Sequence, residues 1–156
     1  MVIAIDMDGT VADLYNVPSW LDRLRREDAG AYRDARPLVD AAALAQALRD
    51  AMDAGARVEF VTWGSKGDTS AGFERATLAA KRDWLDSHGL PYDALRYARH
   101  GTSKSALASP GPGVLIDDEA GNREEWTASG RGPAYPPDGL LRKLADLTAL
   151  VRATRP

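Results

Sequence analysis

The stretch IAIDMDGTVADLY, residues 3–15, decides the fold of this chain because an apolar run leads directly into two acids. The run at residues 2–5 is continuous rather than alternating, which is typical of a strand buried on both faces of a parallel sheet. Two carboxylates at the end of such a strand need a compensating charge, which a bound cation would supply. The alternative is that Asp6 and Asp8 only shape a turn, since Asp and Gly are common in turns.

The composition of the chain is that of one folded domain. Its 156 residues are 44% hydrophobic and 28% charged, so we expect a single domain spanning residues 1–156. The net charge is −3 and no basic stretch is long enough for a nucleic-acid footprint, which argues against nucleic acid as a partner. The absence of cysteine excludes disulfides, thiolate zinc sites and cysteine nucleophiles.

The sequence carries no signal for secretion or for a membrane. No segment approaches the roughly 20 apolar residues that a bilayer span requires. The first apolar run is broken at once by Asp6 and Asp8, and no basic residue precedes it, unlike a secretion signal. We therefore expect a cytoplasmic protein with no membrane partner.

Short apolar strands alternate with amphipathic helices along the chain. We expect strands at residues 2–5, 57–63, 95–98, 113–118 and 134–135. We expect helices at residues 19–28, 38–54, 73–88 and 139–152. Ser19 is expected to cap the first of these helices, while Leu38 and Leu150 should lie on the apolar faces of the second and the last. The alternation predicts an α/β fold, a doubly wound parallel sheet with right-handed crossovers.

Polar side chains follow three of the predicted strands at their carboxyl ends, where open α/β sheets bind ligands. They are Asp6 and Asp8, then Thr62 with Ser65 and Lys66 just beyond it, and finally Asp117 and Asp118. Four carboxylates brought together repel one another, so a divalent cation is their natural partner. Oxygen ligands and the absence of cysteine favour Mg²⁺. Taken singly, Asp117 and Asp118 would instead suit a helix N-terminus, and Thr62 would be an ordinary strand residue.

The motif DMDGT, followed by a strand-terminal Thr, a lysine and a late DD, resembles the haloacid dehalogenase-type phosphohydrolases. The resemblance covers residues 2–126 with the motifs in the right order. Within that superfamily, VTWGSK at 61–66 and KRDW at 81–84 are similar to the 5′(3′)-deoxyribonucleotidase branch. The resemblance implies a Rossmann-like core and an Mg²⁺-dependent phosphatase that works through an aspartyl-phosphate.

Transferred to this sequence, the resemblance assigns roles to the acids. Asp6 would be the nucleophile that attacks phosphorus. Asp8 would protonate the leaving oxygen and then activate water, while its backbone carbonyl binds the metal. Asp118 would ligate Mg²⁺ directly, and Asp117 would be a further ligand. The spacing suits these roles, because residues two apart on an extended chain point the same way.

Other residues of the motifs would serve the phosphoryl group. Gly9 would permit close approach of the backbone to phosphate, and Thr10 would support the turn. Thr62 would hydrogen-bond the phosphoryl oxygens. Lys104 would neutralise charge on Asp6 and on the transferring group.

The lysine assignment has competitors. Lys66 and Lys81 compete with Lys104 for the catalytic role, and any of the three would also suit a solvated surface position. Lys104 is preferred because GTSKSAL precedes the last acidic strand, where the family places its basic residue, and Lys66 is then a second phosphate contact. His88 and His100 are expected at the surface without a catalytic role.

Residues 14–36 are expected to form a small helical cap, because insertions after the first strand cover the active site in this superfamily. Tyr15, Trp20 and Tyr32 in this insertion, together with Trp63, offer aromatic surfaces on which a base would stack. A simpler alternative is that Trp20 and Tyr32 only pack the insertion onto the core.

The function expected from these features is hydrolysis of a small phosphoester, with a nucleoside monophosphate as the favoured substrate. The alternatives are a phosphotransferase or mutase of the same superfamily, a receiver-like signalling domain that accepts phosphate from a kinase, and a catalytically silent binding module. Receiver domains place paired acids at the end of the first strand and the phospho-accepting Asp on a later one, so the DMDGT motif and the insertion after it argue against a receiver. The expected oligomeric state is a monomer or a homodimer, since the last helix would pack on the sheet or partly form a dimer contact.

Overall fold

The computed structural model describes residues 1–154 of the chain. A five-stranded sheet forms its centre, with strand order β5-β4-β1-β6-β7 and every neighbouring pair parallel. The strands are β1 (Val2–Ile5), β4 (Arg57–Trp63), β5 (Ala94–Ala98), β6 (Gly113–Ile116) and β7 (Ala134–Tyr135). The predicted α/β fold with a parallel sheet is therefore confirmed.

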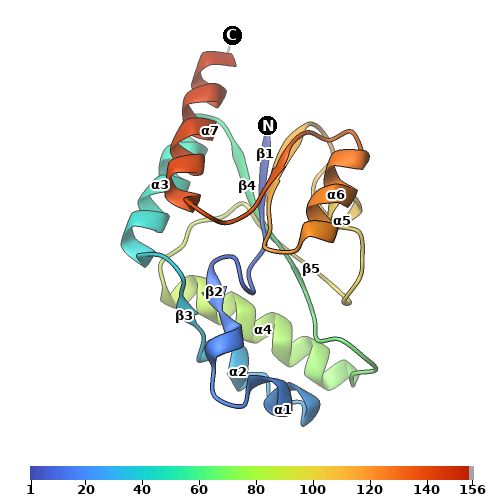
Figure 1. The fold of residues 1–156 in the computed structure, drawn as a ribbon. Helices are drawn as coiled ribbons and strands as arrows, with labels where there is room; N and C mark the ends of the chain where they lie inside the picture. Colours follow the sequence, from blue (N-terminus) through green and yellow to red (C-terminus); the bar gives the residue numbers. More distant parts are fainter. Residues whose placement is uncertain (155–156) are drawn as a thin grey trace.

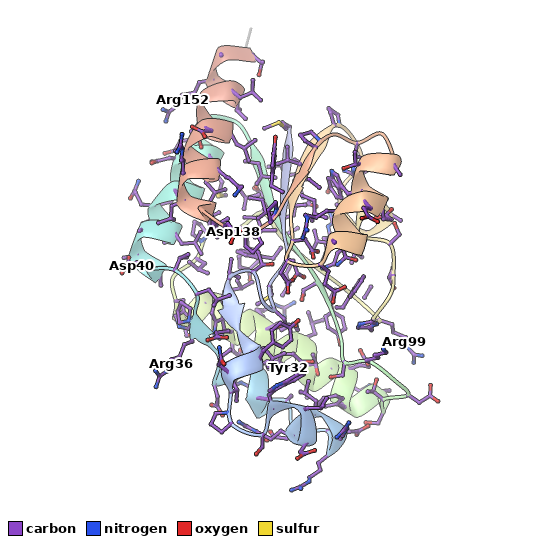
Figure 2. The ribbon with its side chains drawn as sticks, in the orientation of Figure 1. Tyr32, Arg36, Asp40, Arg99, Asp138 and Arg152 are labelled. Carbon is purple, nitrogen blue, oxygen red and sulfur yellow. The ribbon has the colours of Figure 1, made fainter. Side chains whose placement is uncertain are left out.

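Helices cover both faces of this sheet (Figure 1). The helices α3 (Ala41–Asp53) and α7 (Leu140–Thr154) pack side by side on one face, and α4 (Ala71–Ser87) adds Trp84 and Leu85 to the same core. The short helices α5 (Lys104–Leu107) and α6 (Ala120–Ala128) lie on the other face, where Trp126 is fully buried. Side chains from both layers fill the space between helices and strands (Figure 2). Within residues 1–154, no helix is long and apolar enough to cross a bilayer.

Strand β1 lies at the middle of the sheet and is buried on both sides. All four of its residues are buried, with Ile3 and Ile5 in the core under α3 and α7. Val2 and Ala4 face the opposite core beside Trp126. This two-sided burial is the reason that the strand is apolar without alternation.

Three residues of the predicted helices differ in the structure from the sequence-based expectations. Asp40 caps α3 by accepting a hydrogen bond from the Ala43 N–H at 2.7 Å, so Leu38 lies before the helix and is exposed. Ser19 precedes α1 (Trp20–Arg25) in a left-handed conformation and makes no capping bond with its side chain. Leu150 of α7 is 51% exposed, because α7 buries a narrower face against α3 than its leucine content indicates.

Residues 14–36 form a short turn and two short helices that pack on α4. They comprise a 3₁₀ turn (Leu14–Asn16), α1 and α2 (Gly30–Arg33), and are bracketed by the antiparallel pair β2 (Ala12–Asp13) and β3 (Arg36–Pro37). Leu24, Ala31 and Tyr32 form a small separate core with Phe73 and Ala80 of α4. This segment, which we call the insertion, therefore packs on α4 (Figure 1).

A buried carboxylate joins the sheet to the chain that follows α5. Glu59 of β4 is fully buried and accepts hydrogen bonds from the Ser109 N–H at 2.9 Å, the Ser109 hydroxyl at 2.5 Å and Arg57 at 2.6 Å. Burial opposes ionisation of Glu59, but the bonds from Ser109 and Arg57 outweigh it and lower its pKa to about 2. Glu59 thereby fixes the end of α5 against β4.

We expect Glu59→Gln to lower the free energy of unfolding at neutral pH by about 1–3 kcal/mol, the usual range for a buried hydrogen-bonded charge. Because the pKa of Glu59 is depressed in the fold, its contribution is complete above pH 4.5 and is lost as pH falls toward 2. Urea unfolding at stepped pH should therefore show the curves of the two proteins converging in acid. A stability difference that stays constant from pH 7 to pH 3 would contradict this account.

Candidate active site

The carboxyl ends of β1, β4 and β6 meet at one edge of the sheet. Asp6 continues from β1, and its N–H donates to the Ile116 carbonyl of the neighbouring strand at 2.9 Å. Asp117 and Asp118 follow β6 directly. Oxygens of Asp6, Asp117 and Asp118 all lie within 4.8 Å of one another. The convergence expected from the sequence is present for these three acids.

Asp117 is the most enclosed acid of this cluster. It is fully buried, and its carboxylate accepts hydrogen bonds from the Glu119 N–H at 2.9 Å and from the Asn122 side chain at 3.0 and 3.1 Å. Burial, followed by the charge of Asp6, raises the pKa of Asp117 to about 6. Asp118 faces the open side, and burial together with Asp6 and Asp117 raises its pKa to about 7. The cluster therefore carries negative charge that its surroundings only partly offset.

Gly9 and Thr10 shape the backbone around the acids. Gly9 has a φ of +79°, and a Cβ at this position would lie 2.3 Å from Asp118 Oδ2. The Thr10 hydroxyl accepts from the Asp118 N–H at 3.1 Å and lies 3.5 Å from Asp6 Oδ2. Both residues were expected to contact substrate, and the structure places them against the carboxylates, outside the cavity described below. Glycine is required at position 9 because the backbone and Asp118 lie too close together for a side chain.

The cluster fits Mg²⁺. Its ligand atoms are carboxylate oxygens, which this cation prefers, and the raised pKa values of Asp117 and Asp118 indicate charge that a cation would offset. The Asp8 carboxylate lies outside the cluster and is paired elsewhere, as described next. A contribution of Asp8 through its backbone carbonyl stays a prediction.

Two buried lysines serve the two acids of DMDGT separately. Lys104 of α5 is 1% exposed, and its Nζ donates to Asp6 Oδ1 and to the Val61 carbonyl. Burial lowers the pKa of Lys104, but Asp6 and Asp117 outweigh it and raise the pKa, so this lysine stays charged. Lys81 of α4 is fully buried, and its Nζ donates to Asp8 Oδ2 at 2.5 Å and to Thr62 Oγ1 at 2.8 Å.

Neither of these lysines is a surface charge, whereas Lys66 is exposed on the loop after β4. Thr62 is fully buried behind Asp8 and does not line the cavity. One signal marks Lys81 in the sequence: it lies four residues after Thr77 and eight after Phe73, on the buried stripe of α4. A lysine in such a stripe needs an anionic partner.

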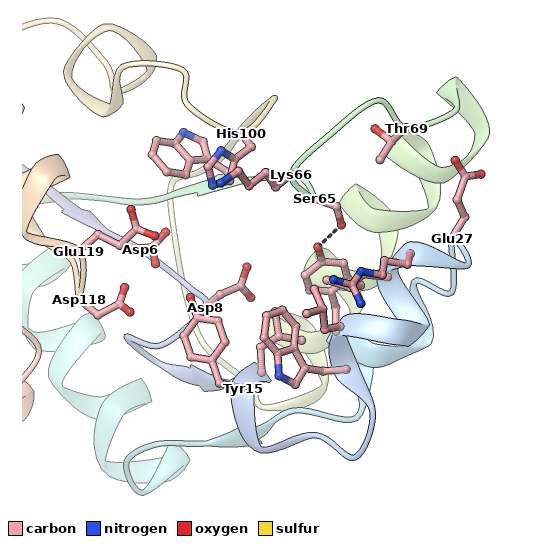
Figure 3. Close-up of a pocket in the computed structure, with 18 of the residues that line it drawn as sticks. Asp6, Asp8, Tyr15, Glu27, Ser65, Lys66, Thr69, His100, Asp118 and Glu119 are labelled. Carbon is pink, nitrogen blue, oxygen red and sulfur yellow. Dashed lines mark hydrogen bonds between the residues drawn. The ribbon is translucent and has the colours of Figure 1, made fainter.

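A cavity of about 660 Å³ opens over the acids, between the sheet edge and the insertion (Figure 3). Asp6, Asp8 and Asp118 line its floor. Tyr15 and Trp20 of the insertion meet edge to face with ring centroids 5.2 Å apart. The remaining wall includes Trp63 and His100, whose rings are 4.8 Å apart, together with Tyr32, Lys66, Arg25, Glu27, Asp68 and Glu119.

The cavity gathers most of the side chains expected to meet substrate. Tyr15, Trp20, Trp63 and Lys66 all line it. His100 was expected at the surface, and it is exposed but also forms part of the cavity wall against Trp63. Its sequence neighbourhood gave no sign of this, because the contact joins the loop after β5 to the end of β4.

No protein-family model and no curated protein matches this sequence. Among solved structures, the D,D-heptose 1,7-bisphosphate phosphatase from Burkholderia thailandensis superposes with a TM-score of 0.57 at 14% identity, covering 93% of this chain and 96% of that chain. The chain therefore shares the fold of this phosphatase. The HAD domain of effector protein Lem4 from Legionella pneumophila has a TM-score of 0.43 at 11% identity, and the match covers 96% of each chain. At this identity the likeness concerns the fold alone.

We expect Mg²⁺ to raise the melting temperature of chelator-treated protein by several degrees, because a ligand that binds only the folded acid cluster stabilises it. Asp118→Asn should remove most of this shift. Asp146→Asn is the matched control, since it removes the same charge from an exposed position on α7. An Asp118→Asn protein that keeps the full shift would contradict the assignment of the cluster.

The same shift should depend on pH. The pKa values of Asp117 and Asp118 are raised to about 6 and about 7, so the metal-free fold loses stability as pH rises from 3.8 through this range. Protons and Mg²⁺ compete for the same carboxylates. The Mg²⁺-induced rise in melting temperature should therefore be larger at pH 8 than at pH 5.5, and equal shifts at both pH values would contradict it.

Proposed function

We propose that this chain is an Mg²⁺-dependent phosphomonoesterase that forms an aspartyl-phosphate on Asp6. The observation that carries the proposal is the pair Asp6 and Asp8, two residues apart on the floor of one cavity and each bonded to its own buried lysine. A nucleophile and a proton donor are thereby fixed beside each other. This arrangement suits transfer of a phosphoryl group to a carboxylate and then to water.

In the first step a carboxylate oxygen of Asp6 attacks phosphorus and the bond to the leaving oxygen breaks. Asp8 gives its proton to that oxygen, so the alcohol leaves neutral. Burial raises the pKa of Asp8 against the opposing charge of Lys81, which suits a carboxyl that carries a proton. In the second step water attacks the aspartyl-phosphate, its proton passes to Asp8, and Asp6 is restored as phosphate leaves.

Asp6, Asp117 and Asp118 would hold Mg²⁺. A cation held there would offset the charge that these carboxylates and an anionic phosphoryl group bring together. Lys104 supplies a second, permanent positive charge on the nucleophile, since it bonds Asp6 Oδ1 and lies 3.5 Å from Asp117 Oδ2.

The substrate class follows from the cavity walls. Tyr15 and Trp20 on the insertion, and Trp63 with His100 on the sheet side, offer aromatic faces above the acid floor. The exposed Lys66 on the rim adds a positive charge for a phosphate. A small phosphoester with a flat organic group fits this space, and a nucleoside monophosphate is the substrate that we favour.

Asp6→Asn should reduce phosphate release from p-nitrophenyl phosphate and from nucleoside monophosphates by at least about 1,000-fold, because the amide cannot act as the nucleophile. Phosphate is measured directly, so transfer to an acceptor other than water is distinguished from hydrolysis. Asp146→Asn should release phosphate at the rate of the unsubstituted protein. A folded Asp6→Asn protein that turns over normally would exclude Asp6 as the nucleophile.

Tyr15→Leu should lower kcat/KM for a nucleoside monophosphate by about 5- to 100-fold, the range expected when a base loses an aromatic stacking partner. Tyr15 is suited to this test because the residue is 45% exposed and lines the cavity. The same variant should change kcat/KM for glycerol phosphate, which has no ring, by less than about 3-fold. Equal losses on both substrates would show that Tyr15 does not contact a base.

A further inference from the structure

The burial of Lys81 is not explained by the fold alone. Its ammonium is enclosed by three groups: the Asp8 carboxylate at 2.5 Å, the Thr62 hydroxyl at 2.8 Å, and the ring of Tyr32, whose centroid is 4.6 Å away. A charge removed from water is retained only with such compensation. The carboxyl group that it bonds belongs to Asp8, whose side chain is 21% exposed and lies on the cavity floor. The lysine therefore acts from inside the protein on a group that faces the cavity.

The bond from Lys81 fixes one end of the Asp8 carboxyl. It uses Oδ2, and no hydrogen bond to Oδ1 from the described residues 1–154 is present. Asp8 lines the cavity, and its carboxyl group points into the open space (Figure 3). With Oδ2 anchored, Oδ1 is left as the oxygen that can exchange a proton with a bound ester.

Lys104 has a different set of partners. Its Nζ bonds Asp6 and the Val61 carbonyl and lies 3.5 Å from Asp117. Neither lysine hydrogen-bonds the aspartate of the other. The two cations arrive from separate helices, α4 and α5, so their contacts can be altered one at a time.

We propose that Lys81 is a positioning residue for the leaving-group proton, and that the two lysines serve different parts of the reaction. The proposal rests on the proposed function. When Asp6 attacks phosphorus and the ester P–O bond breaks, the proton held on Asp8 moves to the departing oxygen, and Lys81 keeps that carboxyl in reach. Lys104 donates a hydrogen bond to Asp6 and so affects formation of the bond between the Asp6 oxygen and phosphorus.

The test is the dependence of kcat/KM on the leaving group, since kcat/KM reports the step in which the ester bond breaks. Dinitrophenolate departs from its phosphate ester without a proton, whereas the alkoxide of a simple alkyl phosphate needs one. Lys81→Met should lower kcat/KM by about 100-fold or more for alkyl phosphates, the usual contribution of a placed general acid, and by less than about 3-fold for dinitrophenyl phosphate. A plot of log kcat/KM against the pKa of the leaving group should therefore be steeper for Lys81→Met than for the unsubstituted protein.

Three further variants sharpen the result. Lys81→Arg keeps the charge and the donors and should restore a shallow slope. Lys81→Gln is one atom shorter and uncharged, so it should steepen the slope as Lys81→Met does, and it replaces that variant if Lys81→Met fails to fold. Lys104→Met should lower kcat/KM by a similar factor for every ester, without a change of slope.

The outcomes separate this proposal from the proposed function. If the unsubstituted protein with Mg²⁺ releases phosphate from no ester in the series, both are overturned. If it releases phosphate but folded Lys81→Met or Lys81→Gln loses the same fraction of kcat/KM on every ester, only the role of Lys81 is overturned. A steeper slope in the Lys81 variants, absent from Lys104→Met, is the supporting result.

Discussion

Repulsion among Asp6, Asp117 and Asp118 is the constraint that organises the site. The three carboxylates meet because β1 and β6 are neighbours and parallel, so both strands deliver their carboxyl ends to one edge. Such crowding opposes folding unless positive charge lies nearby. Lys104 supplies one positive charge from the buried side of the acids. On the other side Asp6 and Asp118 face the cavity, where a cation can reach them.

The surrounding structure follows from that need. Lys104 belongs to a four-residue helix, too short to hold its own position. Glu59 bonds Ser109 just beyond the helix, Arg131 donates to the carbonyls of Ser105 and Ala108, and Glu125 accepts from Ser103 just before it. The polar network on this face of the sheet thus keeps one ammonium group in place.

The order of helices and strands was predictable because each element has a hydrophobic pattern that extends over only a few neighbouring residues. Continuous apolar strands and amphipathic helices can each be recognised within a short window of sequence, and the five strands of the central sheet were predicted in this way, whereas the short pair β2 and β3 was not. The predictions that were wrong concern residues whose burial or helix position depends on a neighbouring element or on a capping residue. Leu150 has the right periodicity, but α3 covers only part of that face of α7, and Leu38 is separated from its helix by the cap at Asp40.

The same distinction separates the acids from the lysines. Asp6, Asp117 and Asp118 could be placed together because parallel strands share an edge, which needs no knowledge of side-chain packing. Lys81 could not be matched to Asp8 so simply, since the two are 73 residues apart and meet only when α4 packs beside β4. The resemblance to a known motif favoured Lys104 as the one catalytic lysine, whereas in the structure both Lys104 and Lys81 bond an acid of the DMDGT motif.

The position of Tyr32 has a consequence for how such a protein can change over evolutionary time. Its ring covers Lys81, and its hydroxyl bonds Ser65 on the loop after β4 at 2.8 Å. Substitutions at Tyr32 that admit a new compound would also expose Lys81 to water and disturb its bond to Asp8. Tyr15 and Leu21 also line this cavity, and neither is among the groups that enclose Lys81. Substitutions at these two positions can therefore admit new compounds while the cover over the lysine stays in place.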